Sequence, residues 1–87
     1  MPFGIASFRS RQQVFAFEAA LSRGGVRAEV VSTPREVALG CGLSVRVSPR
    51  NFRAAVSAFR SNEYRSFLGA YEITRAERGS VARRVMS

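Results

Sequence analysis

Four short segments of the chain alternate apolar with polar residues or are rich in β-branched and aromatic residues, a pattern typical of β-strands. They cover residues 3–8, 26–32, 43–47 and 66–74. Because successive side chains of a strand point to opposite faces, the last segment is expected to carry one apolar face. That face would consist of Phe67, Gly69, Tyr71 and Ile73.

A helix is predicted between the first two strands, since apolar residues recur there at helical spacing. Its buried face is expected to hold Val14, Phe17 and Leu21. Phe15 is expected to pack at the margin of that face. Ser10 and Gln13 occupy the two positions of a capping box, which places the N-cap at Ser10. The glycine pair that follows Arg23 ends the helix.

A second helix is predicted after Ser48, because serine is a favoured N-cap and the following proline suits the first helical position. Its expected buried face consists of Phe52, Ala55, Val56 and Phe59. Between the second and third strands, Thr33 and Glu36 form another capping-box pattern, with Pro34 at the first helical position. A single helical turn closed by Gly40 is expected there.

The element order β-α-β-β-α-β predicts an α+β, ferredoxin-like sandwich. Right-handed crossovers give a four-stranded antiparallel sheet of order 4-1-3-2, with both helices on one face. The helices leave the other face open, and a homodimer could bury it if Leu68 and Ala70 lie there with other apolar residues. Residues 1–75 then form a single domain, and the basic residues 76–87 form a tail that is expected to be flexible.

This topology brings three parts of the chain to the same edge of the sheet: the end of the first strand, the start of the first helix, and the connection between the second and third strands. Arg9, Ser10 and Arg11 lie where that helix begins. We therefore expect Cys41, which lies in the connection, to be near this helix N-terminus. Arg9, Arg11 and Arg35 are then available around the thiol.

Composition excludes most chemistries of small enzymes. The 87 residues contain no His, no Asp, no Lys and one Cys. Ser-His-Asp and Cys-His catalysis, a Schiff-base lysine, a zinc site and an internal disulfide all lack the residues they need. No metal and no cofactor are expected, and a non-catalytic protein is favoured over a turnover enzyme. Neither an apolar run of about 20 residues nor a signal-peptide pattern occurs, so a cytoplasmic protein without membrane contact is expected.

The formal net charge is +8. Residues 1–74 carry ten Arg and five Glu, and residues 75–87 carry four Arg and one Glu, so the charge is spread along the chain. A basic domain fits nucleic acid, an acidic protein partner, or a solvated arginine-rich surface. RNA-recognition domains share the predicted topology but stack bases on aromatic residues of strands one and three. The third strand here has no aromatic residue, which disfavours specific RNA binding and leaves only an electrostatic contact through the tail arginines.

Cys41 is the candidate nucleophile. Gly40 and Gly42 flank it, so no bulky neighbour shields the thiol. The thiolate is the reactive form of a cysteine, and arginine charge or a helix N-terminus lowers the pKa of a thiol. The alternative is that Cys41 is a small buried apolar side chain. From the residues alone, both interpretations stay open.

Three charged residues accompany this cysteine. Arg35 offers a fixed fork of donors that could bind an oxyanion or hold a thiolate or persulfide; the alternative is a solvated side chain. Glu36 completes the capping box, and that structural role is the favoured one. Arg46 is expected to project from the third strand close to the connection, either as a second cation or as an exposed sheet residue.

One stretch of the chain carries a specific motif, namely Thr33-Pro34-Arg35-Glu36, four further residues, and Cys41-Gly42-Leu43. Together with the following strand, which ends in Arg46-Val47, it resembles the signature of the selenium/sulfur carrier protein-like family of small bacterial and archaeal domains. The resemblance covers about residues 3–74. It implies a cysteine that accepts sulfur or selenium as a persulfide or perselenide and passes it on. By position, Cys41 would be the acceptor, and its loop would be shaped by Pro34, Arg35, Gly40 and Gly42.

The resemblance also implies partners. A cysteine desulfurase or a selenocysteine lyase would be the donor, and selenophosphate synthetase or another chalcogen-using enzyme would be the acceptor. A carrier needs one exposed thiol and no acid–base pair, which agrees with the composition. The competing class is a non-catalytic ferredoxin-like module that binds a ligand or forms a homodimer through the open sheet face. Acylphosphatase-like hydrolysis is disfavoured, because the turn after Phe8 has no glycine-rich phosphate loop.

Overall fold

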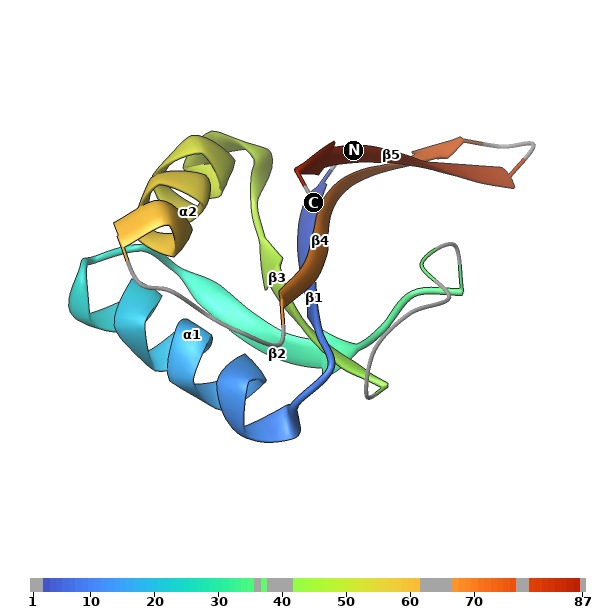
Figure 1. The fold of residues 1–87 in the computed structure, drawn as a ribbon. Helices are drawn as coiled ribbons and strands as arrows, with labels where there is room; N and C mark the ends of the chain where they lie inside the picture. The colour runs from blue at the N-terminus through green and yellow to red at the C-terminus, as the bar shows by residue number, and fades with distance from the viewer. Residues whose placement is uncertain (1–2, 36, 38–41, 62–66, 77–78, 87) are drawn as a thin grey trace.

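The computed structural model describes residues 3–35, 37, 42–61, 67–76 and 79–86. Its elements form one antiparallel sheet of five strands and two helices that lie on one face of the sheet, an α+β arrangement (Figure 1). The elements in chain order are β1 (Phe3–Phe8), α1 (Arg11–Arg23), β2 (Ala28–Ser32), β3 (Leu43–Val47), α2 (Pro49–Ser61), β4 (Phe67–Ala76) and β5 (Gly79–Met86).

The strands lie in the order β2-β3-β1-β4-β5, and every neighbouring pair is antiparallel. The prediction of four strands, with a flexible tail after Arg75, is therefore wrong in its strand count. Residues of the tail form β5, which pairs with β4 from Ala76↔Gly79 to Ala70↔Met86. The strand was not predicted because this segment is rich in arginine and lacks alternating apolar residues. Its backbone pairing with β4 holds it in the sheet.

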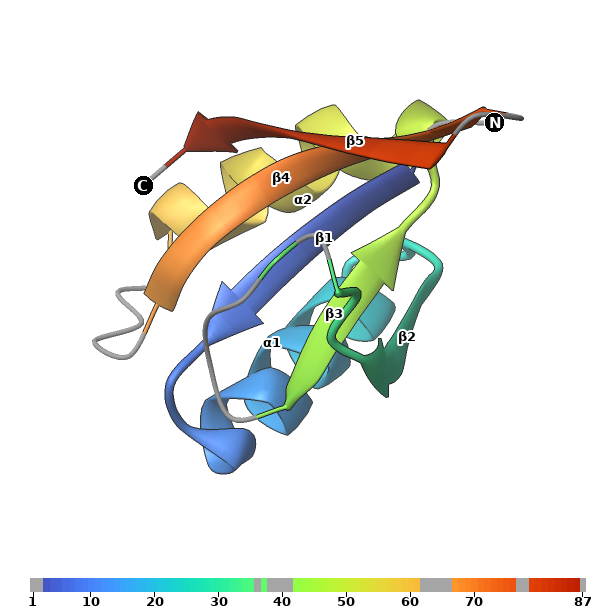
Figure 2. The ribbon, with the colours of Figure 1, turned by 90° about the vertical axis from the view of Figure 1, so that its right-hand side faces the viewer.

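The central strand β1 divides its side chains between the two faces of the sheet, and all six of its residues are buried. We call the face that packs on α1 and α2 the helix face (Figure 2). We call the opposite face the loop face, because Val37 of the connection between β2 and β3 packs on it. Ala6 and Phe8 of β1 belong to the cluster on the helix face. Phe3 and Ile5 belong to a second cluster on the loop face.

The cluster on the helix face is the larger of the two. Its buried members are Ala6, Phe8, Val14, Phe17, Leu21, Val45, Val47 and Ala55. The three residues predicted to form the inner face of the first helix are all among them, which confirms that prediction. The ring of Phe8 lies at the centre, with ring centroids 5.3 Å from Phe17 and 5.6 Å from Phe67. Aromatic pairs at these separations add to the stabilisation from apolar burial.

Strand β4 does not present one apolar face, contrary to the prediction. The register shifts between Ser7 and Phe8, where β1 passes from pairing with Gly69 to pairing with Phe67. Because of this irregularity, Phe67 packs against the cluster on the helix face, whereas Tyr71 and Ile73 belong to the loop face. Ala70 pairs with Ala6 and is 4% exposed, so it does not lie on an open sheet face.

Three further details of the helices differ from expectation. Ser10 stands at the N-cap of α1, but its side chain makes no capping hydrogen bond; its carbonyl accepts the amides of Gln13 and Val14. Phe15 is 52% exposed and does not pack at the margin of the core. Of the predicted inner face of α2, Ala55 is buried and Phe52 is half-buried. The side chains of Val56 and Phe59 lie outside the described residues.

Candidate functional site

The motif that carries Cys41 lies in the connection between β2 and β3, and the base of this connection is fixed by hydrogen bonds. The amide of Thr33 donates to the carbonyl of Gly42 over 2.9 Å, which extends the β2–β3 ladder by one step. The hydroxyls of Thr33 and Ser44 hydrogen-bond at 2.7 Å, and Ser44 is completely buried. The connection therefore leaves the sheet from a rigid base.

Gly42 is the residue that directly follows Cys41, and its backbone explains why a glycine stands there. Its φ of +91° lies in a region that side-chain-bearing residues rarely adopt. Gly42 is exposed, and a Cβ at this position would meet no atom within 4 Å. Backbone conformation, and not lack of space, therefore requires glycine at the exit of the connection.

Val37 attaches the middle of the connection to the loop face. Its amide donates to the carbonyl of Pro34 over 2.9 Å, which closes a tight turn around the exposed Arg35. The Val37 side chain is 4% exposed and belongs to the cluster of Phe3, Ile5, Tyr71 and Ile73. The connection thus folds back over the sheet, and the expectation of an open apolar face is corrected here. Sequence reasoning missed this contact, because a single valine has no periodicity.

Cys41, Gly40 and Glu36, which the sequence analysis singled out, lie outside the described residues. The described part of the connection consists of Thr33, Pro34, Arg35, Val37 and Gly42. The single helical turn expected from Thr33 is represented there by the turn from Pro34 to Val37 alone. The predicted functions of the three residues therefore stay predictions.

Arg46 is held on the loop face by two neighbours. Its guanidinium carbon lies 4.3 Å from the centre of the Phe3 ring, within the range of a cation–π contact. Its Nε lies 4.0 Å from a carboxylate oxygen of Glu29, and both side chains are about half exposed or more. An exposed ion pair of this length stabilises the fold by less than about 1 kcal/mol. The stacking on Phe3 therefore matters more than the ion pair for orienting the guanidinium.

A second arginine has the same arrangement on the other side of the loop face. Arg84 of β5 donates from Nη2 to the hydroxyl of Tyr71 over 2.8 Å. Its guanidinium carbon lies 5.4 Å from the centre of the Tyr71 ring. Sequence reasoning assigned Arg84 to a flexible tail and missed this pair. Residues 79–86 do not alternate apolar with polar side chains, so the sequence carried no strand signal for this pair.

The end of β1, the start of α1 and the base of the β2–β3 connection lie at the same edge of the sheet, as the topology predicted. Ser7 pairs with Ser44, so the end of β1 lies beside the start of β3, at the base of the connection. The exposed Arg9 and Arg11 follow β1 at this edge. From there α1 packs on the helix face, whereas Val37 lies on the loop face. Although they share this edge, the start of α1 and the turn that carries Arg35 therefore lie toward opposite faces of the sheet.

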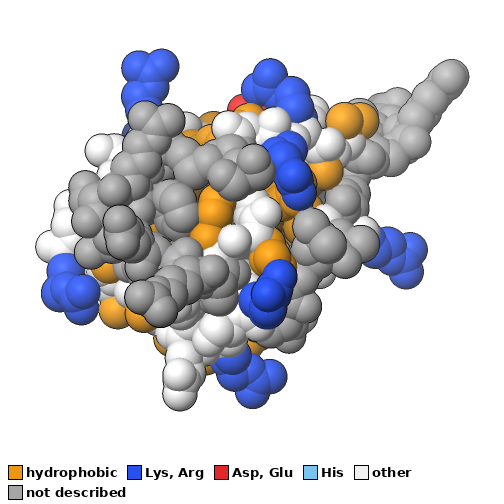
Figure 3. All heavy atoms as spheres, in the orientation of Figure 1, with side chains coloured by type: hydrophobic (Ala, Val, Ile, Leu, Met, Phe, Trp, Pro, Cys, Tyr) orange, Lys and Arg blue, Asp and Glu red, His pale blue; other side chains and the backbone are white. Residues whose placement is uncertain are grey.

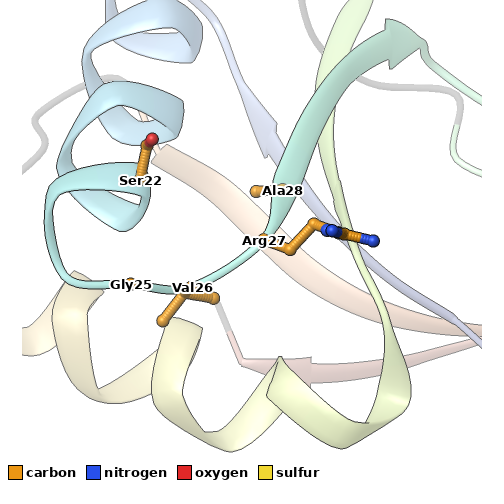
Figure 4. A pocket seen from close by; sticks show the side chains of 5 residues that line it. All are labelled: Ser22, Gly25, Val26, Arg27 and Ala28. Carbon is orange, nitrogen blue, oxygen red and sulfur yellow. The ribbon is translucent and has the colours of Figure 1, made fainter.

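A shallow, open pocket lies away from this site, at the turn between α1 and β2 (Figure 4). Its volume is about 330 Å³, and its lining consists of Ser22, Gly25, Val26, Arg27 and Ala28. The turn is shaped by Gly25, whose φ is +80°. In Figure 4 the guanidinium of Arg27 extends away from Ser22, so the two polar groups of the lining do not converge.

Arginine accounts for most of the charged side chains that are visible on one face of the molecule (Figure 3). Figure 3 shows arginine side chains spread around the visible face, with apolar side chains between them. Among the described residues no three His, Cys, Asp or Glu side chains are grouped as metal ligands would be. Within the same part of the chain, neither helix has the length and apolar character needed to cross a bilayer.

Comparison with known proteins gives one match. A family model described as "Putative Se/S carrier protein-like" matches residues 3–68. The matched segment contains β1, both helices, β2, β3 and the connection with Cys41, and it ends where β4 begins. No curated protein and no solved structure matches the chain.

Proposed function

The chain belongs to the Se/S carrier protein-like family, and from this premise we propose that it carries sulfur or selenium on Cys41 as a persulfide or perselenide. The observation that carries the proposal is the family match, which spans the complete motif from Thr33 to Leu43. The protein accepts the chalcogen from a cysteine desulfurase or selenocysteine lyase. It delivers the chalcogen to a partner enzyme such as selenophosphate synthetase.

The architecture of the connection supports this function. A carrier has to present its thiol to two partner active sites, so the thiol must stand away from the packed core while its segment keeps a defined place. The base at Thr33 and Gly42 and the attachment at Val37 hold the two sides of the connection. The residue after Cys41 is exposed and carries no side chain, which leaves room for the approach of another protein.

The chemistry is a thiol exchange that needs no external oxidant. The Cys41 thiolate attacks the outer sulfur of the donor persulfide, a sulfur–sulfur bond forms to Cys41, and the bond to the donor sulfur breaks. The donor leaves as a thiolate, and Cys41 becomes a persulfide. An acceptor thiolate then attacks the outer sulfur of that persulfide and regenerates the Cys41 thiolate. The same balance holds with selenium as the transferred atom.

The other motif residues have positioning functions in this scheme. Pro34 and Gly42 fix the backbone on the two sides of the connection, Gly40 flanks the thiol, and Glu36 belongs to the capping pattern. Arg35 is exposed in the turn and supplies positive charge for the transferred anionic chalcogen. Arg46 supplies a second cation on the loop face.

The competing function, a dimeric binding module, depends on an open apolar sheet face. Four apolar residues at the centre of the loop face, Phe3, Ile5, Tyr71 and Ile73, are at most 8% exposed, and Val31 and Ala82 beside them are half-buried. Packing against Val37 leaves little apolar surface at this centre for a second copy. No described observation therefore favours this function over the carrier.

Intact-mass spectrometry under non-reducing conditions tests the carrier function. The protein is incubated with a cysteine desulfurase and cysteine, or with a selenocysteine lyase and selenocysteine. We expect an adduct of one sulfur or one selenium atom that is lost on reduction and is absent in Cys41→Ser. Wild-type protein that stays unmodified with both donors would overturn the proposal, provided that the donors transfer their chalcogen to a small thiol in the same assay.

A further inference from the structure

We propose that the loop face is a docking surface for an acidic segment of a partner protein, bound by Arg46 of β3 at one end and by Arg84 of β5 at the other. The identity of the partner, a chalcogen donor or acceptor, rests on the proposed function. The location rests on described residues alone. Arg84 lies beyond residue 68, where the family match ends.

The two arginines lie in one row across the sheet. Arg46 pairs with Ile5, Ile5 pairs with Tyr71, and Tyr71 pairs with Arg84. Directly paired residues of antiparallel strands point to the same face, so both guanidinium groups belong to the loop face. Three strand spacings of about 4.8 Å place the two Cα atoms about 14 Å apart. This distance is too long for a single phosphate or carboxylate group to bridge.

Each guanidinium is oriented by a ring on the same face. Arg46 lies over Phe3 and Arg84 lies over Tyr71. An arginine stacked on a ring has lost part of its side-chain freedom before binding, so less entropy is lost when it pairs with a carboxylate. Arg46 and Arg84 are both exposed, which leaves guanidinium donors accessible from solvent. The only described acidic side chain in the row is Glu29, at its β2 end.

A protein segment is favoured over RNA as the bound partner, because the rings of Phe3 and Tyr71 are buried and covered by arginine. Sequence-specific RNA binding needs aromatic faces on which unstacked bases can lie. Phe3 is 6% exposed and Tyr71 is 8% exposed, and an arginine lies over each of them. The surface therefore offers oriented cations around a closed apolar centre, which suits carboxylates of a protein segment that crosses the sheet.

The test measures binding of a fluorescent hexaglutamate peptide by anisotropy, with all proteins in the Cys41→Ser background so that thiol chemistry plays no part. An extended peptide of this length spans about 20 Å and reaches both arginines. The variant is Arg46→Gln/Arg84→Gln. The matched control is Arg50→Gln/Arg53→Gln, which removes the same charge from exposed positions of α2. Circular dichroism and thermal unfolding verify that each protein is folded.

We expect the loop-face variant to weaken hexaglutamate binding by about tenfold or more, and the α2 control by about twofold or less. Arg46→Lys/Arg84→Lys is expected to bind between wild type and the Gln variant, because it keeps charge and loses the planar fork. Equal losses in both Gln variants would overturn the proposal and indicate diffuse attraction. Tighter binding of an oligouridylate that depends on the same two arginines would overturn it in favour of nucleic acid.

The docking surface and the carrier function fail in different ways. Chalcogen transfer to wild-type protein without any position-specific effect on peptide binding would leave the carrier and remove the docking surface. Position-specific peptide binding with no adduct on Cys41 would leave the docking surface and remove the carrier. If both hold, Arg84→Gln, which leaves the residues of the carrier motif intact, is expected to slow transfer from the donor enzyme and to leave reaction with a small-molecule persulfide unchanged.

Discussion

The helix face and the loop face of the sheet bury side chains in different ways. On the helix face, the two helices, β1 and β3 contribute buried side chains to one continuous cluster around Phe8, and β2 and β4 add half-buried ones. On the loop face, four side chains of β1 and β4 are covered by a single described residue of the connection, Val37. Arginines stacked on rings complete this cover. The comparison indicates that the first face supplies most of the packed core, whereas the second has a thinner cover and is the face on which we propose that a partner docks.

The largest effect is expected from truncation on the helix face. Phe17→Ala removes a ring that is 2% exposed and that packs against Phe8, so we expect a loss of about 3–5 kcal/mol in the free energy of unfolding. Urea unfolding followed by circular dichroism measures it. Phe15→Ala is the matched control, since this ring is 52% exposed and its removal should change stability by less than about 0.5 kcal/mol. Similar losses for the two variants would contradict the assignment of the helix face as the stabilising core.

A smaller effect is expected when the same truncation is made on the loop face. Val37→Ala should lower the free energy of unfolding by about 1–2 kcal/mol, because a connection between strands can shift to close part of the cavity that the truncation leaves. Val45→Ala, at a completely buried position of β3 on the helix face, is expected to cost more. Urea unfolding of both proteins gives the comparison. A larger loss at Val37 than at Val45 would reverse the proposed difference between the faces.

The smallest effect is expected at the base of the connection. Thr33→Val removes the hydroxyl partner of the buried Ser44 and should cost about 1 kcal/mol, with a similar cost for Ser44→Ala. The double variant should cost less than the sum of the two, since it leaves neither hydroxyl without its partner. A double-mutant cycle in urea gives the coupling energy. Additive losses would show that this hydrogen bond does not hold the connection to the sheet.

Local patterns predicted the parts of the fold that depend on neighbours in sequence. The helical spacing of Val14, Phe17 and Leu21 identified the inner face of α1, because the buried residues of a helix recur every three or four positions in its own sequence. The strands Phe3–Phe8 and Leu43–Val47 were predicted with the bounds that the structure gives them. The motif around Cys41 was found from its residues, and the family match agrees with it.

What the sequence did not predict depends on contacts between distant parts of the chain. Phe67 reaches the helix face through an irregularity in the pairing of β1 with β4, which no alternation within β4 can express. Val37 is buried by strands that lie far from it in sequence. Arg84 is ordered by Tyr71 across the β4–β5 pairing, while its own segment has the composition of a solvated tail. In each case the structure depends on a residue that is distant in sequence, and a local sequence pattern does not include that residue.

The central position of β1 has a consequence for the order in which the protein is assembled. Residues 3–8 are synthesised before both of their partner strands, β3 and β4, and β4 leaves the ribosome about 60 residues after them. Until β4 is available, one edge of this almost wholly apolar strand has no partner, and pairing over such a separation is slow. A nascent chain that stops before β4 therefore exposes a strand prone to wrong pairing, and chaperone binding during translation should decline once residues 67–73 can close the sheet.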